Sequence, residues 1–547
     1  VVDGAIAVVS HVGARSCRGE LLRTLLFGAP LKLAMFTEAL IVLVLLLFIG
    51  ACDFASVNFS YAFTLSSVIS ASFMVISIIS PLLSVAILGG QLASAQRLSA
   101  VSSPPQTVTP PTAAAADDDA DGNIETPTDK VWAFFGLRRG GRAYFGLDIS
   151  NPDAPQKMWS VSHTDPGMSE LGQSWSEPVV TQVPGVDAPV IIIAGGYDIN
   201  KDNAGIGTPD SMGRAVFILD AESGDIVHRF TASDVTTIGV TQFPTTDSLA
   251  TKVSIMDTDG DGVTDRFYAV DTGGNVWRFD LPDDDRSHWS VFHFAELGGD
   301  TLSDDRRFFG EVSVAPSSFE RVEAITVEQN GGDQIITTSS ETPFDAVLVG
   351  SGNRASPNGG ATQDYLFVLR DVHIRTQYYG AAGIPPPPPI LLTDLFDATG
   401  ALPGEIETAD SRLASQLSLS AAKGWHLPLR PTEKALSAPT LISGVAYFTT
   451  FLPGELATAN TCVAAGQGFL YAFTLQDGRL LKRTIIGSVL PDTPQIVVPP
   501  PNEGSEDEWS PNLYLVGVGA GEDSKGTIDT RQSLTPKRIY YQYGERQ

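Results

Sequence analysis

The fold is decided by the stretch Phe267-Tyr-Ala-Val-Asp-Thr-Gly-Gly-Asn-Val-Trp277. Its first four residues are aromatic, small or β-branched, which favours a β-strand. Aspartate, two glycines and asparagine follow, and these residues favour a tight turn. A second short run then leads to Trp277. The stretch therefore predicts a β-hairpin with an aspartate at its turn and a tryptophan in its second strand.

The same pattern recurs along the chain, around Asp148 leading to Trp159 and around Asp220 leading to His228. Residues 365–371 repeat the first half, and residues 469–478 are a decayed copy. A single hairpin cannot bury its own face, so the copies must pack against one another. The repeats predict an all-β fold, an irregular β-propeller of about seven blades. We expect each aspartate to accept backbone amides of its turn and each tryptophan to lie between neighbouring blades.

Directly before this hairpin lies an acidic nonapeptide, Asp257-Thr-Asp-Gly-Asp-Gly-Val-Thr-Asp265. Carboxylates at alternate residues of a tight loop can point to one centre, and Ca²⁺ prefers several oxygen ligands. Gly262 allows the sharp turn. The predicted calcium ligands are the side chains of Asp257, Asp259, Asp261 and Asp265 and the backbone carbonyl of Val263.

The flanks of this loop argue against an EF-hand. Position twelve of an EF-hand loop is a glutamate, and here it is Tyr268. Residues 251–256 and 266–270 both have the composition of strands. We therefore predict a calcium loop at the tip of a β-hairpin. The alternative is an acidic turn without an ion, but carboxylates this close together repel each other unless a cation joins them.

Two further acidic segments resemble this loop. In residues 117–125, alternate acidic residues precede Gly122, and the candidate ligands of a weaker second site are Asp117, Asp119, Asp121, Asn123 and Glu125. A disordered acidic patch is the alternative for this segment. The third segment runs from Asp198 to Asp202. It contains Lys201 and lacks a suitably placed glycine, which favours a plain turn.

The overall composition limits the classes of function. The chain has 547 residues and a formal net charge of −28, which argues against nucleic acid as a partner. Cys17, Cys52 and Cys462 are too far apart for a zinc or haem motif, and they do not form a disulfide framework.

Residues 1–97 differ from the rest of the chain because they are strongly apolar, and residues 98–116 form a linker rich in Pro, Ser and Ala. The apolar runs 33–52 and 66–90 approach or exceed the length that spans a bilayer. Three interpretations remain open: a membrane anchor, a targeting segment cleaved near residues 92–96, and a non-native N-terminus. The propeller is expected in residues 117–547.

Several segments carry a resemblance to a known family: residues 137–152, 175–178, 195–198, 212–215, 257–265, 268–280, 306–309, 350–354, 424–425, 433–434 and 447–453. In order along the chain, they resemble the C-terminal β-propeller of PilY-type adhesins and biogenesis proteins of type IV pili. The resemblance implies an exported, calcium-binding, non-enzymatic protein of the pilus tip (fimbrium) or cell surface. It also implies that residues 257–265 hold Ca²⁺.

The resemblance further implies a role in pilus biogenesis. Such a protein counters pilus retraction and takes part in adhesion and twitching motility, and its expected partners are pilins or minor pilins and a host or abiotic surface. Residues 33–52 and 66–90 are candidate membrane contacts. Two other classes of function remain: a general surface-binding propeller and a calcium- and quinone-dependent dehydrogenase. The dehydrogenase has less support because quinone sites of that fold have adjacent cysteines, and this chain has none.

Overall fold

The computed structural model describes residues 130–497, except 152, 203–205, 233–238, 330–331, 381–382, 401, 407, 455–465 and 489, together with residues 514–516 and 527–529. The chain divides into two compact units. The first comprises Val1–Phe135 and Asp148–Gln156, and the second comprises Gly136–Leu147 and Lys157–Gln547. The acidic segment 117–125 and the apolar runs 33–52 and 66–90 lie outside the described residues.

Strands dominate the described residues, which confirms the all-β prediction. The first three strands form one sheet in the order β1-β2-β3, with the bounds β1 (Trp132–Gly136), β2 (Ala143–Asp148) and β3 (Gln156–Ser162). The second unit begins its own sheets with five strands in the order β4-β5-β6-β7-β8. Their bounds are β4 (Val179–Thr181), β5 (Val190–Ala194), β6 (Ala215–Asp220), β7 (Ile226–Thr231) and β8 (Val240–Gln242).

The next two sheets also have five strands each, in the orders β16-β12-β11-β10-β9 and β13-β14-β15-β18-β17. The former consists of β9 (Ser254–Met256), β10 (Arg266–Val270), β11 (Asn275–Asp280), β12 (Ser290–Glu296) and β16 (Ile390–Leu391). The latter consists of β13 (Ser313–Gln329), β14 (Gly332–Gly350), β15 (Tyr365–Asp371), β17 (Phe396–Asp397) and β18 (Gly424–Pro428).

A four-stranded and a three-stranded sheet follow, in the orders β19-β20-β21-β22 and β23-β24-β25. Their strands are β19 (Thr440–Ile442), β20 (Val445–Pro453), β21 (Gly466–Thr474), β22 (Leu480–Gly487), β23 (Gln495–Val497), β24 (Tyr514–Val516) and β25 (Thr527–Asp529). The helices of the described residues are α5 (Ala409–Ala421) and the short 3₁₀ turns η2 (Ile199–Asp202), η3 (Arg286–His288), η4 (Leu392–Asp394) and η5 (Pro403–Glu405).

Consecutive sheets of the second unit pack face to face, and the strands between them bury both of their faces. In β10, Phe267 and Ala269 join a core cluster with β5 and β6, while Tyr268 and Val270 join a cluster with β14 and β15. Strand β14 repeats this arrangement, because Ala346 and Leu348 pack instead with β20 and β21. Successive side chains of a strand point to opposite faces, so residues 267–270 of β10 and 346–349 of β14 are apolar on both faces and hold two neighbouring sheets.

The repeated aspartates act at their turns as predicted. Asp148 accepts the amide of Ser150, and Asp220 accepts the amides of Glu222 and Ser223 at 3.0 and 2.7 Å. Asp271 accepts the amides of Gly273 and Asn275 at 2.9 and 3.0 Å. Its other oxygen accepts the indole N–H of Trp277 at 2.7 Å, so this aspartate joins both strands of its hairpin.

Two tryptophans connect one strand with the turn of another sheet. The indole of Trp159 in β3 donates to the carbonyl of Ala221 at 2.9 Å and covers Gly224, in the turn between β6 and β7. The indole of Trp425 in β18 donates to the carbonyl of Leu475 at 2.8 Å and covers Gly478, in the turn between β21 and β22. The predicted position between neighbouring sheets is confirmed for Trp159, and Trp425, which was not part of the predicted repeats, has the same arrangement.

This packing gives a testable consequence at Gly224, where an added methyl group would lie 2.7 Å from the indole of Trp159. We expect Gly224→Ala to destabilise the protein by about 1–3 kcal/mol more than Gly444→Ala. Both glycines have a φ of +78°, so both substitutions have the cost of a left-handed residue, but Gly444 has open space around it. Urea unfolding of the two variants measures the difference. Equal destabilisation would show that the indole does not fill this space.

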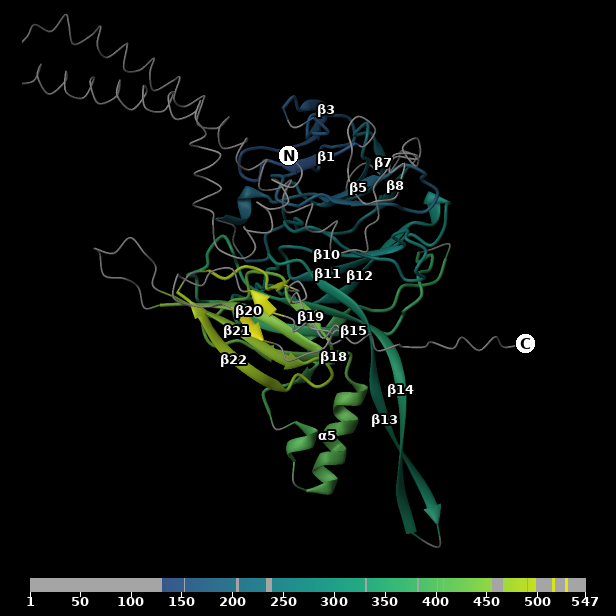
Figure 1. Ribbon diagram of the computed structural model, residues 1–547. Coiled ribbons are helices and arrows are strands. Elements are labelled where there is room, and N and C mark those ends of the chain that lie inside the picture. The colour runs from purple at the N-terminus through teal and green to yellow at the C-terminus, as the bar shows by residue number, and fades with distance from the viewer. Residues whose placement is uncertain are drawn as a thin grey trace, which may run out of the picture. The chain divides into compact units, whose positions relative to one another are not determined.

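The ribbon formed by β13 and β14 is much longer than the other strands of its sheet. The two strands pair continuously from Ser313↔Leu348 to Gln329↔Gly332, whereas β14 pairs with β15 only from residue 345 to residue 350. Figure 1 shows the ribbon continuing past α5. The amide of Val322 in β13 donates to the hydroxyl of Ser420 in α5 at 2.7 Å, which holds the helix against the ribbon.

Among the described residues, no helix combines the length and the apolarity that a bilayer crossing needs.

Candidate metal-binding site

The acidic nonapeptide closes a β-hairpin, as predicted. Strands β9 and β10 are antiparallel, and Met256 pairs with Arg266 directly below the loop. Gly260 and Gly262 both have left-handed backbone angles, with φ of +83° and +88°. A residue with a side chain rarely adopts this conformation, so the two glycines give the loop its tight curvature.

This curvature brings three of the predicted ligands together. Asp257, Asp259 and Asp261 each offer a carboxylate oxygen, and these oxygens lie within 4.8 Å of one another. Two oxygens bound to one Ca²⁺ ion are at most about 5 Å apart, because each Ca–O distance is about 2.3–2.6 Å. The three side chains are exposed. The donor set and its spacing therefore fit a calcium ion.

Backbone amides already orient these carboxylates. Asp257 accepts the amides of Gly260 and Gly262 at 2.6 and 2.9 Å, and Asp261 accepts the amide of Val263 at 2.8 Å. A carboxylate oxygen has two lone pairs, so these bonds leave acceptor capacity for a cation. The loop therefore holds its acidic side chains in place by its own backbone.

Asp265, the predicted closing ligand, lies outside this group of three. It accepts the amide of Thr258 at 3.1 Å and also the hydroxyl of Thr258. Burial raises the pKa of the Asp265 carboxyl, and the bonds from Thr258 oppose this shift. In this structure Asp265 joins the two ends of the loop, directly before β10 begins. Its role as a ligand, like that of the Val263 carbonyl, stays a prediction.

A buried ionic network lies directly beneath the loop, and nothing in the sequence pattern indicated it. Arg266 follows the loop and is fully buried, and its Nη1 donates to Asp345 of β14 at 2.6 Å. Its Nε lies 3.7 Å from Asp280, too far for a hydrogen bond. Burial raises the pKa of the Asp345 carboxyl to about 6, although the charge of Arg266 opposes this shift.

Arg278 is the centre of this network. It is fully buried in β11 and uses all five N–H groups. Two go to Asp280 at 2.8 and 2.7 Å, and one goes to Asp371 of β15 at 2.7 Å. The other two go to the carbonyls of His373 and Arg375. Arg266 and Arg278 thus connect the hairpin of the acidic loop to β14 and β15 of the next sheet.

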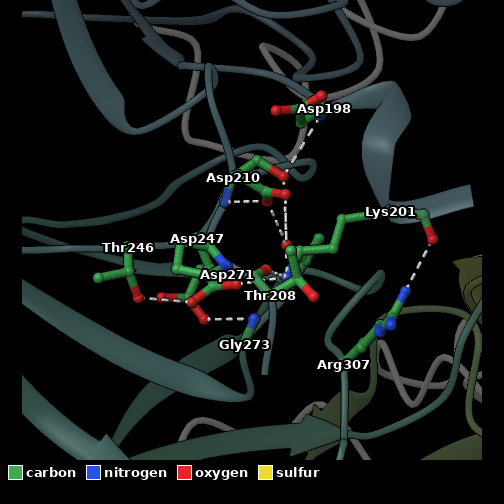
Figure 2. Close-up of polar contacts among 12 residues, drawn as sticks. Asp198, Lys201, Thr208, Asp210, Thr246, Asp247, Asp271, Gly273 and Arg307 are labelled. Carbon is green, nitrogen blue, oxygen red and sulfur yellow. Dashed lines mark hydrogen bonds and ion pairs between the residues drawn. The ribbon is translucent and has the colours of Figure 1, made fainter. Parts of the chain in front are cut away.

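A second charged cluster lies at the other end of β10. The 5 residues of this strand separate it from the acidic loop by about 17 Å, at the rise per residue of an extended strand. Figure 2 shows Lys201 reaching into it between Asp247 and Asp210. Its ammonium is buried, donates to Asp247 at 2.5 Å and to the carbonyl of Thr208 at 2.8 Å, and lies 3.8 Å from Asp210. Burial raises the pKa of the Asp210 carboxyl.

This cluster explains the third acidic segment, from Asp198 to Asp202. Asp198 accepts the amides of Asn200, Ser211 and Met212, so it organises a turn, as predicted. Lys201 supplies the positive charge between Asp210 and Asp247. Lys201, the residue that argued against a metal site in this segment, therefore pairs with the carboxylates of Asp210 and Asp247.

Residues 114–330 match the family model of the PilY1 beta-propeller domain. This part of the chain is therefore similar to the PilY1 β-propeller family. The matched range includes the acidic nonapeptide, the Asp271 hairpin and all of β13. The predicted resemblance and the propeller fold are confirmed, while the number of blades and the domain boundaries stay predictions.

Relatives with the same family name cover different shares of the chain. A type IV pilus biogenesis factor PilY1 homolog of Xylella fastidiosa is 23% identical over 372 residues, which is 63% of this chain and 21% of the relative. The PilY1 factor of Pseudomonas aeruginosa is 31% identical over 146 residues, 26% of this chain and 11% of the relative. The chain thus spans about a fifth or less of these PilY1 proteins.

A solved structure was also compared, the C-terminal domain of Pseudomonas aeruginosa PilY1. It aligns with a TM-score of 0.44 and 15% identity, over 70% of this chain and 79% of that domain.

Proposed function

We propose that this chain provides the calcium-binding β-propeller of a type IV pilus biogenesis factor and has no enzymatic activity. The observation that carries the proposal is the position of the loop: three gathered carboxylates lie inside the residues that match the PilY1 propeller family. The relatives are named as pilus biogenesis factors, which supports the same role. The proposed location is the pilus tip or the outer cell surface.

Calcium would act here on structure. The carboxylates of Asp257, Asp259 and Asp261 repel one another, so an ion that binds all three stabilises the folded loop relative to other conformations. The loop continues directly into Arg266, which contacts Asp345 in the next sheet. Ion binding would therefore stabilise the junction between two neighbouring sheets, where the propeller must resist mechanical load if it opposes pilus retraction. Adhesion and twitching motility would follow from pili that persist at the surface.

A genetic experiment tests this function in the organism that carries the gene. We expect Asp257→Asn combined with Asp261→Asn to reduce surface pili several-fold and to reduce twitching. Pili should return when the retraction motor is also inactivated, because the proposed role opposes retraction. The control is Asp187→Asn with Asp284→Asn, which removes two exposed charges elsewhere. Normal piliation in the loop variant would contradict the proposal and favour a general surface-binding propeller.

A further inference from the structure

A cavity of about 400 Å³ lies where the base of β13, the C-terminal end of α5 and the proline run meet. Its walls are largely apolar and include Phe294, Phe319, Val372, Pro387, Pro388 and Ile390. This cavity is separate from the acidic loop and from the Lys201 cluster.

One positive charge in the wall of this cavity lacks a negative partner. Arg370 is 6% exposed and stacks on Phe319, with its guanidinium carbon 4.1 Å from the ring centre. It donates to the carbonyls of Leu419, Ala422 and Gln476 at 2.9, 3.2 and 3.1 Å. Among the described residues it pairs with no carboxylate, and burial lowers its pKa to about 10.

The carbonyls around Arg370 offset only part of its charge. Two of them end α5, and a helix C-terminus carries about half an elementary negative charge. The other ions of the cavity wall already have partners. Arg321 pairs with Glu323 at 2.9 Å, Lys423 with Asp394 at 3.1 Å, and Asp371 with Arg278 at 2.7 Å. The charge of Arg370 that remains therefore makes the cavity suited to an anion.

An exposed apolar surface leads from this cavity along the ribbon. Phe319, Arg321 and Glu323 line the cavity, and alternate residues of a strand share one face, so Ile325 and Val327 continue the same face. Ile336 stands directly opposite Ile325 across the ribbon. These three residues are 52%, 36% and 47% exposed. The neighbouring Ile335 is 64% exposed and belongs to the opposite face.

We propose that this cavity binds the carboxylate of an extended apolar peptide, which lies along the ribbon face of Ile325, Val327 and Ile336. The carboxylate would pair with Arg370, since charge-assisted bonds to guanidinium are strong. The apolar side chains of the peptide would cover the exposed isoleucines and valine. The chain as a whole has a net charge of −28, which repels an anionic group. Such a group is therefore expected to bind only beside a local positive charge such as that of Arg370.

Binding of a short probe to the full 547-residue chain tests the proposal. The probe is the peptide acetyl-Thr-Val-Thr-Val-Val with a free C-terminal carboxylate, and its matched control is the same peptide with a C-terminal amide. Isothermal titration calorimetry should show at least tenfold tighter binding of the free acid, because only the acid can pair with Arg370. Equal affinities, or no binding of either peptide, would overturn the proposal. So would hexanoate binding as tightly as the peptide, because the ribbon would then have no part.

Two neighbouring isoleucines provide the matched variants. We expect Ile336→Ser to weaken binding of the free-acid peptide about tenfold and Ile335→Ser to leave it unchanged. Both side chains are exposed on β14, so neither substitution should prevent folding. Arg370→Gln should abolish the preference for the acid over the amide. If it fails to fold because three carbonyls lose their donor, the isoleucine pair still decides: equal effects of Ile336→Ser and Ile335→Ser would rule out docking on this face.

Discussion

Replacement of Arg278 by methionine should destabilise the protein by about 3–5 kcal/mol, the largest effect expected of a single substitution in this chain. Methionine fills a similar volume but removes five hydrogen-bond donors. The carboxylates of Asp280 and Asp371 would then lie buried without the cation that Arg278 provides. The hydroxyl of Tyr268, which donates to Asp371 at 2.7 Å, cannot replace a full charge. Equilibrium urea unfolding measures the loss.

The pH dependence of this variant distinguishes lost charge pairing from lost packing. Burial raises the pKa of the Asp280 carboxyl, and the charge of Arg278 opposes that shift. Without Arg278 the folded-state pKa rises further, so the folded variant binds protons that the unfolded chain releases. Stability then falls as the pH rises through the interval between the two pKa values. We therefore expect the difference from wild type to be smaller at pH 5 than at pH 8.

The control for this variant is Arg321→Met, which breaks the exposed pair between Arg321 and Glu323. Exposed ion pairs contribute little, so we expect a change within about 0.5 kcal/mol. A loss at Arg278 as small as the loss at Arg321, or one that does not change with pH, would contradict the network as a source of stability.

Removal of two carboxylates from the acidic loop should abolish its calcium binding. At a free calcium concentration one hundred times the Kd, a bound ion stabilises the folded state by about 2.7 kcal/mol. We expect the wild-type chain to gain this stability on addition of calcium and lose it with a chelator. The Asp257→Asn, Asp261→Asn variant should show neither change at this calcium concentration, because the group of three then keeps a single negative charge and amide oxygens bind the ion far more weakly than carboxylates. Calorimetric titration and urea unfolding provide independent readouts.

Two further variants make the calcium experiment specific. Asp187→Asn with Asp284→Asn removes the same formal charge from exposed positions outside the loop and should leave the calcium response intact. Asp265→Asn should weaken calcium binding less than Asp257→Asn, because Asp265 already accepts two bonds from Thr258. Unchanged calcium binding in the double loop variant would refute the site.

The local sequence pattern was sufficient to predict the elements that depend on contacts between near neighbours in the chain. The alternate aspartates and the glycines of residues 257–265 predicted a hairpin loop, and its strands pair as expected. The turn aspartates and the tryptophan on Gly224 also followed from the repeat. The loop was recognisable because its ligands, turn residues and flanking strands all lie within about fifteen residues.

Contacts between distant residues could not be predicted in this way. Arg278 and Asp371 are 93 positions apart, and Arg266 and Asp345 are 79 apart. In the sequence each arginine looks like an ordinary strand residue beside an aspartate. Lys201 likewise looked like an interruption of an acidic turn, although Asp247 receives its ammonium 46 positions later. No local spacing encodes such pairs, because they depend on which sheets become neighbours.

The sequence by itself therefore determined the repeated hairpins, the acidic loop at a hairpin tip, and the resemblance of residues 114–330 to the PilY1 propeller family. Tertiary structure alone decided that buried arginines join the loop to the next sheet, and that Arg370 lines a cavity without a carboxylate partner among the described residues. The physical reason is the separation, along the chain, of the residues that interact. Turn geometry and alternation are set by bonds between near neighbours, whereas the burial and pairing of a charge depend on the distant segments that exclude water from it.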